Sequence, residues 1–196
     1  MASVLVVCTG NVCRSPIAEG LLRAVLFSRL GERAPVISST GTMGWEGSGA
    51  DPSSVQAAAE RGIDISGHRA RELRPEDAFG SDLVIAMARE HADAMRNLVP
   101  KRTFTLKELV HLVEALPPPR TGEPDGMLTA RVSEADALRR SGFEGNPYDE
   151  DVADPLGMPL ESFRAVAWEL EDLCGRLADG LFGGIPARAP ATADEE

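Results

Sequence analysis

The chain has 196 residues, 43% of them apolar, and a formal net charge of −11 at pH 7. This length and apolar content predict one globular domain, and the negative charge argues against nucleic acid as a partner because phosphate backbones would be repelled. With no apolar run of membrane-span length, no signal peptide before the first strand, and three cysteines without metal-site spacing, we expect a cytoplasmic protein.

The N-terminal segment predicts a strand, a tight loop and a helix in succession. Residues 4–7 form a short, β-branched apolar run that is typical of a buried parallel strand. Ser15 and Pro16 are a helix-start signal, with Ser15 as the N-cap, and the helix is expected to end at Gly31. Residues 8–14 therefore form a loop between the carboxyl end of a strand and the N-terminus of a helix.

That loop has the features of an anion site. Backbone N–H groups converge there, and the helix dipole adds partial positive charge. Gly10 permits close backbone approach, and Asn11 tolerates left-handed geometry. Cys8 lies at the base of this cradle as a candidate nucleophile, and Arg14 supplies a planar fork for two phosphate oxygens. The Ser15 hydroxyl can donate a hydrogen bond to the cysteine sulfur.

The remainder of the chain alternates predicted strands and helices, which indicates an α/β fold with a parallel sheet. A glycine-rich stretch around Trp45 follows the second strand and is expected to be a loop, with Trp45 as a candidate core anchor. The later strands are predicted at residues 36–39, 83–87 and 103–105, and the later helices at residues 51–61, 75–79, 88–99, 106–116 and 158–181.

Two segments depart from this alternation. Residues 116–148 begin with prolines and glycines and continue with weak helical spacing, and the segment is longer than an ordinary loop. We expect it to be a mobile or partly helical insertion close to the active site. Residues 185–196 are rich in alanine, proline and acidic residues and are expected to be a disordered tail. The predicted organisation is thus a single domain over residues 1–182.

The string Val-Cys-Thr-Gly-Asn-Val-Cys-Arg-Ser-Pro at residues 7–16 resembles the phosphate loop of the low-molecular-weight protein tyrosine phosphatase family, bacterial type. The resemblance covers about residues 3–115 and 149–182. It implies the phosphotyrosine protein phosphatase I-like fold, a four-stranded parallel sheet of order 2-1-3-4 with helices on both faces. It also implies a substrate-binding set of Thr9, Gly10, Asn11, Val12, Cys13 and Ser15, with Trp45 as one wall of the cleft.

A second motif, Asp154-Pro155, matches the general-acid loop of this family. Proline stiffens a loop and so places one carboxylate reproducibly, and a carboxylic acid can protonate the leaving oxygen of a phosphate ester. Asp149 and Asp151 are rival carboxylates, but neither precedes a proline. Leu156, a further substrate-binding candidate, stands where many members carry an aromatic residue, so one wall of the cleft is reduced.

The resemblance implies a phosphatase that hydrolyses protein phosphotyrosine through a cysteinyl-phosphate, with Cys8, Arg14 and Asp154 as catalytic residues and no metal or cofactor. His68, in a recurring family stretch, is expected to brace the phosphate loop. The implied partners are a phosphorylated protein substrate and, as a candidate, a cognate tyrosine kinase.

Four alternatives stay open. The first alternative is a protein arginine phosphatase. Family members that resemble such enzymes carry threonine at position 12, whereas this chain has Val12, which cannot donate a hydrogen bond. An arsenate reductase needs a further cysteine pair near the third strand, and residues 80–95 contain none. A non-catalytic phosphate-binding module would not require an intact set of catalytic groups, and a flavodoxin-like FMN binder would have no use for Cys8 and Arg14.

Overall fold

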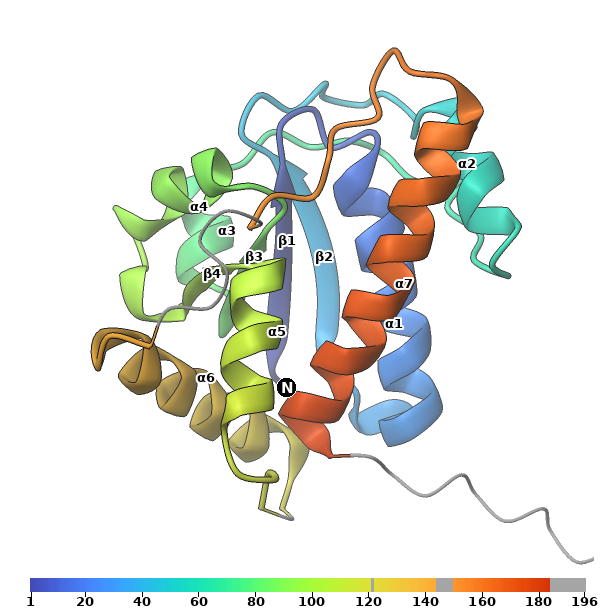
Figure 1. Ribbon diagram of the computed structural model, residues 1–196. Coiled ribbons are helices and arrows are strands. Elements are labelled where there is room, and N and C mark those ends of the chain that lie inside the picture. The colour runs from blue at the N-terminus through green and yellow to red at the C-terminus, as the bar shows by residue number, and fades with distance from the viewer. Residues whose placement is uncertain (121, 144–149, 184–196) are drawn as a thin grey trace, which may run out of the picture.

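A four-stranded parallel sheet forms the centre of the molecule (Figure 1). The structure is a computed structural model and describes residues 1–120, 122–143 and 150–183. Adjacent strands are parallel and follow the order β2-β1-β3-β4, which confirms the predicted fold class. The strands are β1 (Ser3–Cys8), β2 (Val36–Gly41), β3 (Leu83–Ala86) and β4 (Thr103–Thr105).

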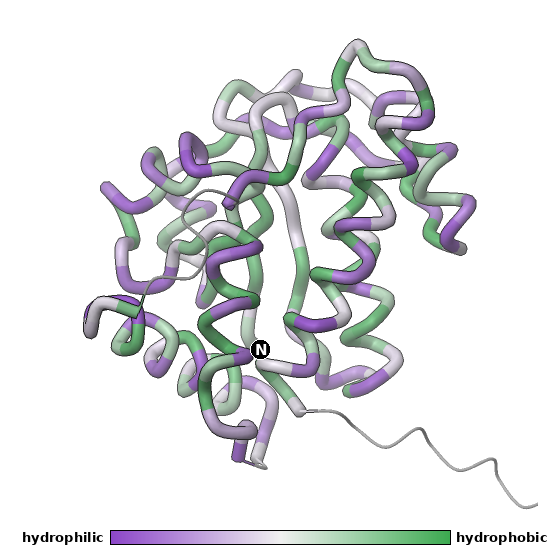
Figure 2. Tube along the Cα trace, viewed as in Figure 1, coloured by the Kyte–Doolittle hydropathy of each residue, from purple (hydrophilic) through white to green (hydrophobic). Residues whose placement is uncertain are grey.

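Helices cover both faces of the sheet, so its strands are buried on either side. Val4 and Val6 of β1 belong to a larger core beneath α1, α5 and α7, whereas Leu5 and Val7 belong to a smaller core beneath α3 and α4. Figure 2 shows α5 and α7 alternating between hydrophobic and hydrophilic residues, as expected of amphipathic helices. The helices are α1 (Arg14–Leu30), α2 (Pro52–Ala59), α3 (Pro75–Phe79), α4 (Arg89–Arg96), α5 (Leu106–Ala115), α6 (Pro124–Arg140) and α7 (Leu160–Phe182), with 3₁₀ turns η1 (Gly31–Arg33) and η2 (Pro100–Arg102).

Helix starts follow the local sequence at α2 and α5 but not at α1. The Asp51 carboxylate accepts a hydrogen bond from the Ser53 amide at 2.8 Å and caps α2, and Thr105 caps α5. The first helix begins one residue before the predicted N-cap, at Arg14, and Cys13 is its N-cap. Ser15 is not a cap because its hydroxyl contacts the Cys8 sulfur instead.

The segment after α5 was expected to be mobile or partly helical and close to the active site, and its location differs from that expectation. Residues 124–140 form α6, which contacts α5, α7 and η2 at the amino ends of the strands, the lower end in Figure 1. Its Leu128 and Ala135 side chains are fully buried. Arg131 donates hydrogen bonds to the carbonyl oxygens of Val113 at 3.0 Å and Gly180 at 2.8 Å, which joins α6 to the ends of α5 and α7. The predicted tail, residues 185–196, lies outside the described residues.

Candidate active site

The phosphate loop connects β1 to α1 at the carboxyl edge of the sheet. Because β1 is paired with β2 on one side and β3 on the other, this loop lies where the chain switches direction across the sheet. In open α/β folds, ligands bind in the crevice at such a point. The sequence prediction of a strand, a loop and a helix therefore places Cys8 at the position where this class of fold binds ligands.

The backbone of the loop is oriented by its carbonyl groups. Every carbonyl from Cys8 to Cys13 accepts a hydrogen bond from elsewhere in the chain, at 2.8 to 3.5 Å. The donors are the amides of Thr42, Met43, Trp45, Asp51 and Ile17 and the ring of His68. Since the carbonyls face outward, the amides between them face the interior of the loop and form an anion cradle. His68 thus has the bracing position predicted for it, on the Asn11 carbonyl.

A glycine outside the loop makes this close packing possible. A Cβ atom on Gly41, at the end of β2, would lie 2.3 Å from the Thr9 carbonyl oxygen and 2.9 Å from the Asn11 amide nitrogen. Both distances are too short for any side chain. The end of β2 therefore has to be glycine for the phosphate loop to adopt this conformation.

Asn11 holds the centre of the loop through both its backbone and its side chain. Its φ of 56° is the only positive value among the described non-glycine residues. The side-chain oxygen accepts from the Arg71 amide at 2.9 Å, and the side-chain nitrogen donates to the hydroxyls of Ser15 and Ser39, both at 2.8 Å. These bonds satisfy a fully buried amide group, and they stabilise a backbone conformation that other side chains rarely adopt.

The Cys8 sulfur lies 3.0 Å from the Ser15 hydroxyl oxygen. That oxygen already accepts a hydrogen bond from the Asn11 side chain, so its own proton is free to point toward the sulfur. A donated hydrogen bond stabilises a thiolate more than a thiol. The Ser15 hydroxyl is thus placed to stabilise negative charge on the Cys8 sulfur.

Arg14 lies beneath the rim of the loop and is 4% exposed. One terminal nitrogen donates to an Asp154 carboxylate oxygen at 2.8 Å, and the other donates to the Val152 carbonyl at 3.2 Å. Its Nε is buried with no hydrogen-bond partner among the described residues. A buried, unpartnered guanidinium donor beside inward-facing amides is suited to an incoming anion.

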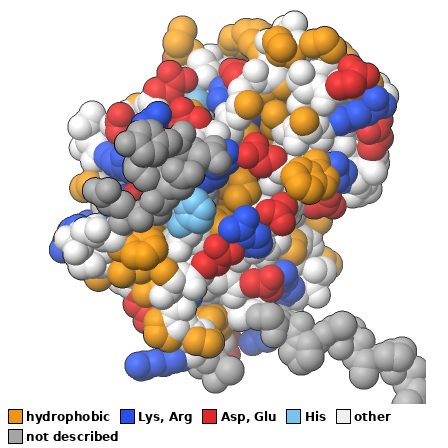
Figure 3. All heavy atoms as spheres, viewed as in Figure 1, with side chains coloured by type: hydrophobic (Ala, Val, Ile, Leu, Met, Phe, Trp, Pro, Cys, Tyr) orange, Lys and Arg blue, Asp and Glu red, His pale blue; other side chains and the backbone are white. Residues whose placement is uncertain are grey.

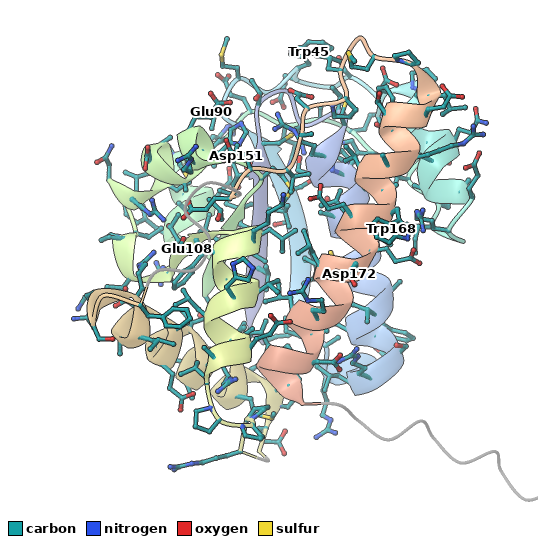
Figure 4. All side chains as sticks on the ribbon, in the orientation of Figure 1. Trp45, Glu90, Glu108, Asp151, Trp168 and Asp172 are labelled. Atoms are coloured by element: carbon teal, nitrogen blue, oxygen red, sulfur yellow. The ribbon has the colours of Figure 1, made fainter. Side chains whose placement is uncertain are left out.

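The general-acid loop reaches this site from the C-terminal part of the chain. Its Val152 amide donates to the Met87 carbonyl at the end of β3, at 2.8 Å. The Asp151 carboxylate accepts from the Arg89 amide at 2.8 Å and so caps α4, whose own N-cap residue, Ala88, provides no side-chain bond. Asp151 lies beside α4 in Figure 4. Of the two rival carboxylates, Asp151 thus has a structural role, and Asp149 lies outside the described residues.

His91, at the start of α4, is part of the site and was missed by the sequence analysis. It is 1% exposed, and its Nε2 lies 2.9 Å from the Thr9 hydroxyl, which accepts a hydrogen bond from Arg14 at 3.3 Å. Burial lowers the pKa of His91 below its ordinary value, and the positive charge of Arg14 lowers the pKa further. The signal that could have revealed it is its position just after β3, since the carboxyl ends of parallel strands share one edge.

One small cavity brings most of the predicted site residues together. Its volume is about 70 Å³. Trp45 is half exposed, and its ring lies over Gly10, so it forms a wall of the cavity rather than an anchor in the core. The lining residues are Cys8, Thr9, Gly10, Val12, Cys13, Arg14, Trp45, Asp154 and Leu156, with Asn11 and Ser15 behind them.

The other two cysteines are buried free thiols. Burial raises the pKa of Cys13 to about 12, so this thiol stays protonated although it lines the cavity. Cys174 of α7 is also held protonated, because burial raises its pKa. The geometry therefore singles out Cys8, with its serine donor, as the nucleophile candidate among the three.

Comparison with known proteins gives one family. Residues 3–123 match the sequence profile of the family described as low molecular weight phosphotyrosine protein phosphatase. A protein-arginine-phosphatase of Geobacillus stearothermophilus is 32% identical over 181 residues, which cover 91% of this chain and 95% of that protein. A low molecular weight protein-tyrosine-phosphatase of Streptomyces coelicolor is 39% identical over 121 residues, 61% of this chain and 71% of that protein.

Solved structures of this family are also similar to the chain. The crystal structure of a low molecular weight protein tyrosine phosphatase from T. tengcongensis has a TM-score of 0.67 and 37% sequence identity, covering 92% of this chain and all of that chain. Within the described ranges, 1–120, 122–143 and 150–183, no helix is long and apolar enough to span a membrane.

Proposed function

The chain belongs to the low molecular weight phosphotyrosine protein phosphatase family, and we propose that it hydrolyses phosphotyrosine in proteins with Cys8 as nucleophile, Arg14 as phosphate-binding cation and Asp154 as general acid. The observation that carries this proposal is that all three side chains line one cavity, with Cys8 at the base of a cradle of backbone amides. The matched profile supports the reaction class, and the geometry supports the assignment of roles.

In the first step, the Cys8 thiolate attacks the phosphorus atom in line with the bond to the tyrosine oxygen. The inward-facing amides and the Arg14 guanidinium hold the three equatorial oxygens, where negative charge is distributed in the transition state. Asp154 gives its proton to the leaving tyrosine oxygen. The phosphorus–oxygen bond breaks, and a cysteinyl-phosphate forms.

In the second step, water attacks the cysteinyl-phosphate. Asp154, now a carboxylate, accepts a proton from that water, and the sulfur leaves as a thiolate. The Ser15 hydroxyl, 3.0 Å from the sulfur, stabilises the departing thiolate. Because the cradle and Arg14 supply the positive groups around the phosphoryl oxygens, we expect turnover in the presence of a metal chelator.

Three residues at the mouth of the cavity support an aromatic substrate. Val12 is buried and has no hydroxyl, so it offers nothing to a polar guanidinium group. Trp45 and Leu156 are both partly exposed and add apolar walls above the loop. None of these three side chains could form an ion pair with a guanidinium, whereas all of them can pack against a phenyl ring.

Phosphoarginine is the second candidate substrate. It is favoured by the 32% identity to the Geobacillus stearothermophilus protein-arginine-phosphatase, because that match extends over 91% of this chain. We expect position 12 to decide between phosphotyrosine and phosphoarginine. A threonine there would have almost the same shape as Val12 but would place a hydroxyl inside the phosphate loop.

The test compares kcat/KM for phosphotyrosine, phosphoserine and phosphoarginine peptides with chelator present, in the wild type and in Val12→Thr. We expect the wild type to prefer phosphotyrosine, and the substitution to shift the ratio toward phosphoarginine. A wild-type preference for phosphoarginine would establish the second candidate. A ratio unaffected by Val12→Thr would show that position 12 does not determine the choice.

We also propose a cytoplasmic location, with a tyrosine kinase that phosphorylates the same proteins as the functional partner. Three free cysteines, all buried, support a reducing compartment. Cell fractionation of the untagged protein tests the location. Loss of phosphotyrosine from co-expressed kinase substrates tests the partnership.

A further inference from the structure

A second hollow lies on the other side of the general-acid loop. It has a volume of about 490 Å³ and runs between this loop and the first turns of α7. We call it the Trp168 groove. It is lined by Ala153, Asp154, Pro155, Met158, Ser162, Ala165, Val166, Trp168 and Glu169. Figure 3 shows hydrophobic side chains gathered toward the upper end of this face, where the general-acid loop lies.

The two largest side chains of the groove are exposed to solvent. Trp168 is 65% exposed and Met158 is 55% exposed. The buried stripe of α7 includes Phe163, Leu170 and Leu177, and Trp168 lies outside it, projecting from the helix in Figure 4. Tryptophan and methionine on a concave surface are typical of binding sites, because they supply large apolar contact areas.

The Trp168 groove and the catalytic cavity adjoin at one residue. Asp154 lines both, so Asp154 and Pro155 form the ridge between them. The catalytic cavity, at about 70 Å³, is far smaller than the ~300–1,000 Å³ of ordinary ligand pockets. A substrate protein whose phosphoryl group enters this cavity therefore lies mostly outside it, across the adjoining surface.

The charges around the groove favour an apolar occupant over an acidic one. Glu169 is paired with Lys107 at 2.7 Å, so the charged end of the groove is already neutralised. Asp154 is paired with Arg14 at 2.8 Å on the catalytic side. What remains facing the groove is mainly the apolar surface of Met158, Val166 and Trp168.

We propose that the Trp168 groove binds an apolar side chain of the substrate protein, close in sequence to the phosphorylated residue. This inference rests on the proposed function and specifies the substrate class further: phosphoproteins with a leucine-like or aromatic residue near the phosphorylation site. The substrate chain crosses the ridge at Pro155 and places one side chain on each side of it.

The kinetic test uses phosphotyrosine peptides in which a single leucine is moved position by position through a glycine- and serine-rich background. A small aryl phosphate serves as the reference substrate. We expect one leucine position to lower KM in the wild type. Trp168→Ala should lower the ratio of kcat/KM for that peptide to kcat/KM for the aryl phosphate about tenfold. Trp168→Phe should recover most of the ratio.

Phe79→Ala is the matched control, because Phe79 is a similarly exposed aromatic residue on α3, outside both hollows. It should leave the ratio unchanged. No leucine preference in the wild type, or an equal fall in Trp168→Ala and Phe79→Ala, would overturn the groove proposal. A wild type that hydrolyses neither the aryl phosphate nor any peptide would instead overturn the proposed function, so the two failures are distinguishable.

Tryptophan fluorescence tests binding in the Trp168 groove directly. The chain has two tryptophans, so in a Trp45→Phe, Cys8→Ser double variant the fluorescence comes from Trp168 alone. Titration with the leucine phosphopeptide should shift its emission, and the all-glycine phosphopeptide should not. Equal shifts would contradict the proposal. A concentration-dependent dimer that Trp168→Ala abolishes would also contradict it, by assigning the groove to a second copy of the chain.

Discussion

The phosphate loop and the general-acid loop meet in one cavity, but they are held by different means. Six successive carbonyls of the phosphate loop are hydrogen-bonded to the surrounding chain, and Cys8 at its base is 2% exposed. Among the described residues, the general-acid loop is hydrogen-bonded to the rest of the chain at Val152, at Asp151 and, through Arg14, at Asp154, and the Asp154 side chain is 45% exposed.

Under the proposed mechanism, this difference means that the two loops contribute to catalysis in separable ways. The phosphate loop would act through backbone groups and a nucleophile that every substrate needs. The general-acid loop would act through one carboxyl group, which matters only when the leaving group requires a proton. Substitutions in the two loops should therefore differ in their dependence on the substrate, and the following predictions test that difference.

The largest effect should come from Cys8→Ser. It removes the nucleophile and leaves the amide cradle and Arg14 in place, so turnover of every phosphate ester should be abolished while phosphopeptide binding remains. Stopped assays on aryl phosphates and calorimetric titration with a phosphotyrosine peptide measure the two quantities. Retention of a tenth of the wild-type rate would rule out the covalent mechanism.

Asp154→Ala should slow phosphotyrosine hydrolysis by about 10²- to 10⁴-fold, because the leaving oxygen loses its proton donor. An acidic leaving group departs without that proton, so hydrolysis of a substrate that carries one should be slowed much less. The measurement is kcat across a series of aryl phosphates with different leaving-group pKa values. Asp179→Ala, at the opposite end of α7, is the matched control. Equal slowing across the series would remove Asp154 from the general-acid role.

Asp151→Ala should have a smaller effect of the same kind. It removes the cap on α4 and loosens the loop that places Asp154, so we expect kcat on phosphotyrosine to fall about tenfold. Asp151→Asn should recover most of the rate, because an amide oxygen can still accept the hydrogen bond from the Arg89 amide. If Asp151→Asn is as slow as Asp154→Ala, then Asp151 is itself the proton donor.

The smallest effect concerns His91 and pH. The pKa of His91 in the folded state is lowered, so below its ordinary value of ~6.5 the unfolded chain binds a proton that the folded chain does not. The folded protein should therefore lose stability as the pH falls from about 6.5 toward the lowered pKa. In His91→Gln, the decrease in Tm between neutral and mildly acidic pH should be smaller. An unchanged decrease would contradict this linkage.

Sequence reasoning succeeded where neighbours in the chain are neighbours in space. The succession of strand, loop and helix around Cys8 follows from local propensities, and Asp154 became the general-acid candidate because Asp154-Pro155 matches a family motif. The alternation of strands and helices also indicated the α/β class. The strand order came from a family resemblance rather than from local propensities, since pairing joins distant segments.

The parts that were missed depend on contacts between distant segments. Asp151 caps a helix that begins 62 residues earlier in the chain, and no local sequence pattern predicts such a hydrogen bond. Ser15 has the sequence of a helix cap, but its hydroxyl contacts Cys8 because the phosphate loop brings the sulfur to it. For α6, a helical spacing was present at Leu128, Val132 and Ala135, and the preceding prolines and glycines obscured how well it packs.

The outward carbonyls of the phosphate loop have a consequence for hydrogen exchange. Amides usually exchange slowly in rigid segments because they are hydrogen-bonded to the protein. In this loop the amides face the cavity, so they should exchange rapidly with deuterated solvent although the backbone is firmly held. A bound phosphoryl group would accept hydrogen bonds from these amides and slow their exchange. Slower exchange of these amides would therefore report phosphoryl binding even if the conformation of the loop does not change.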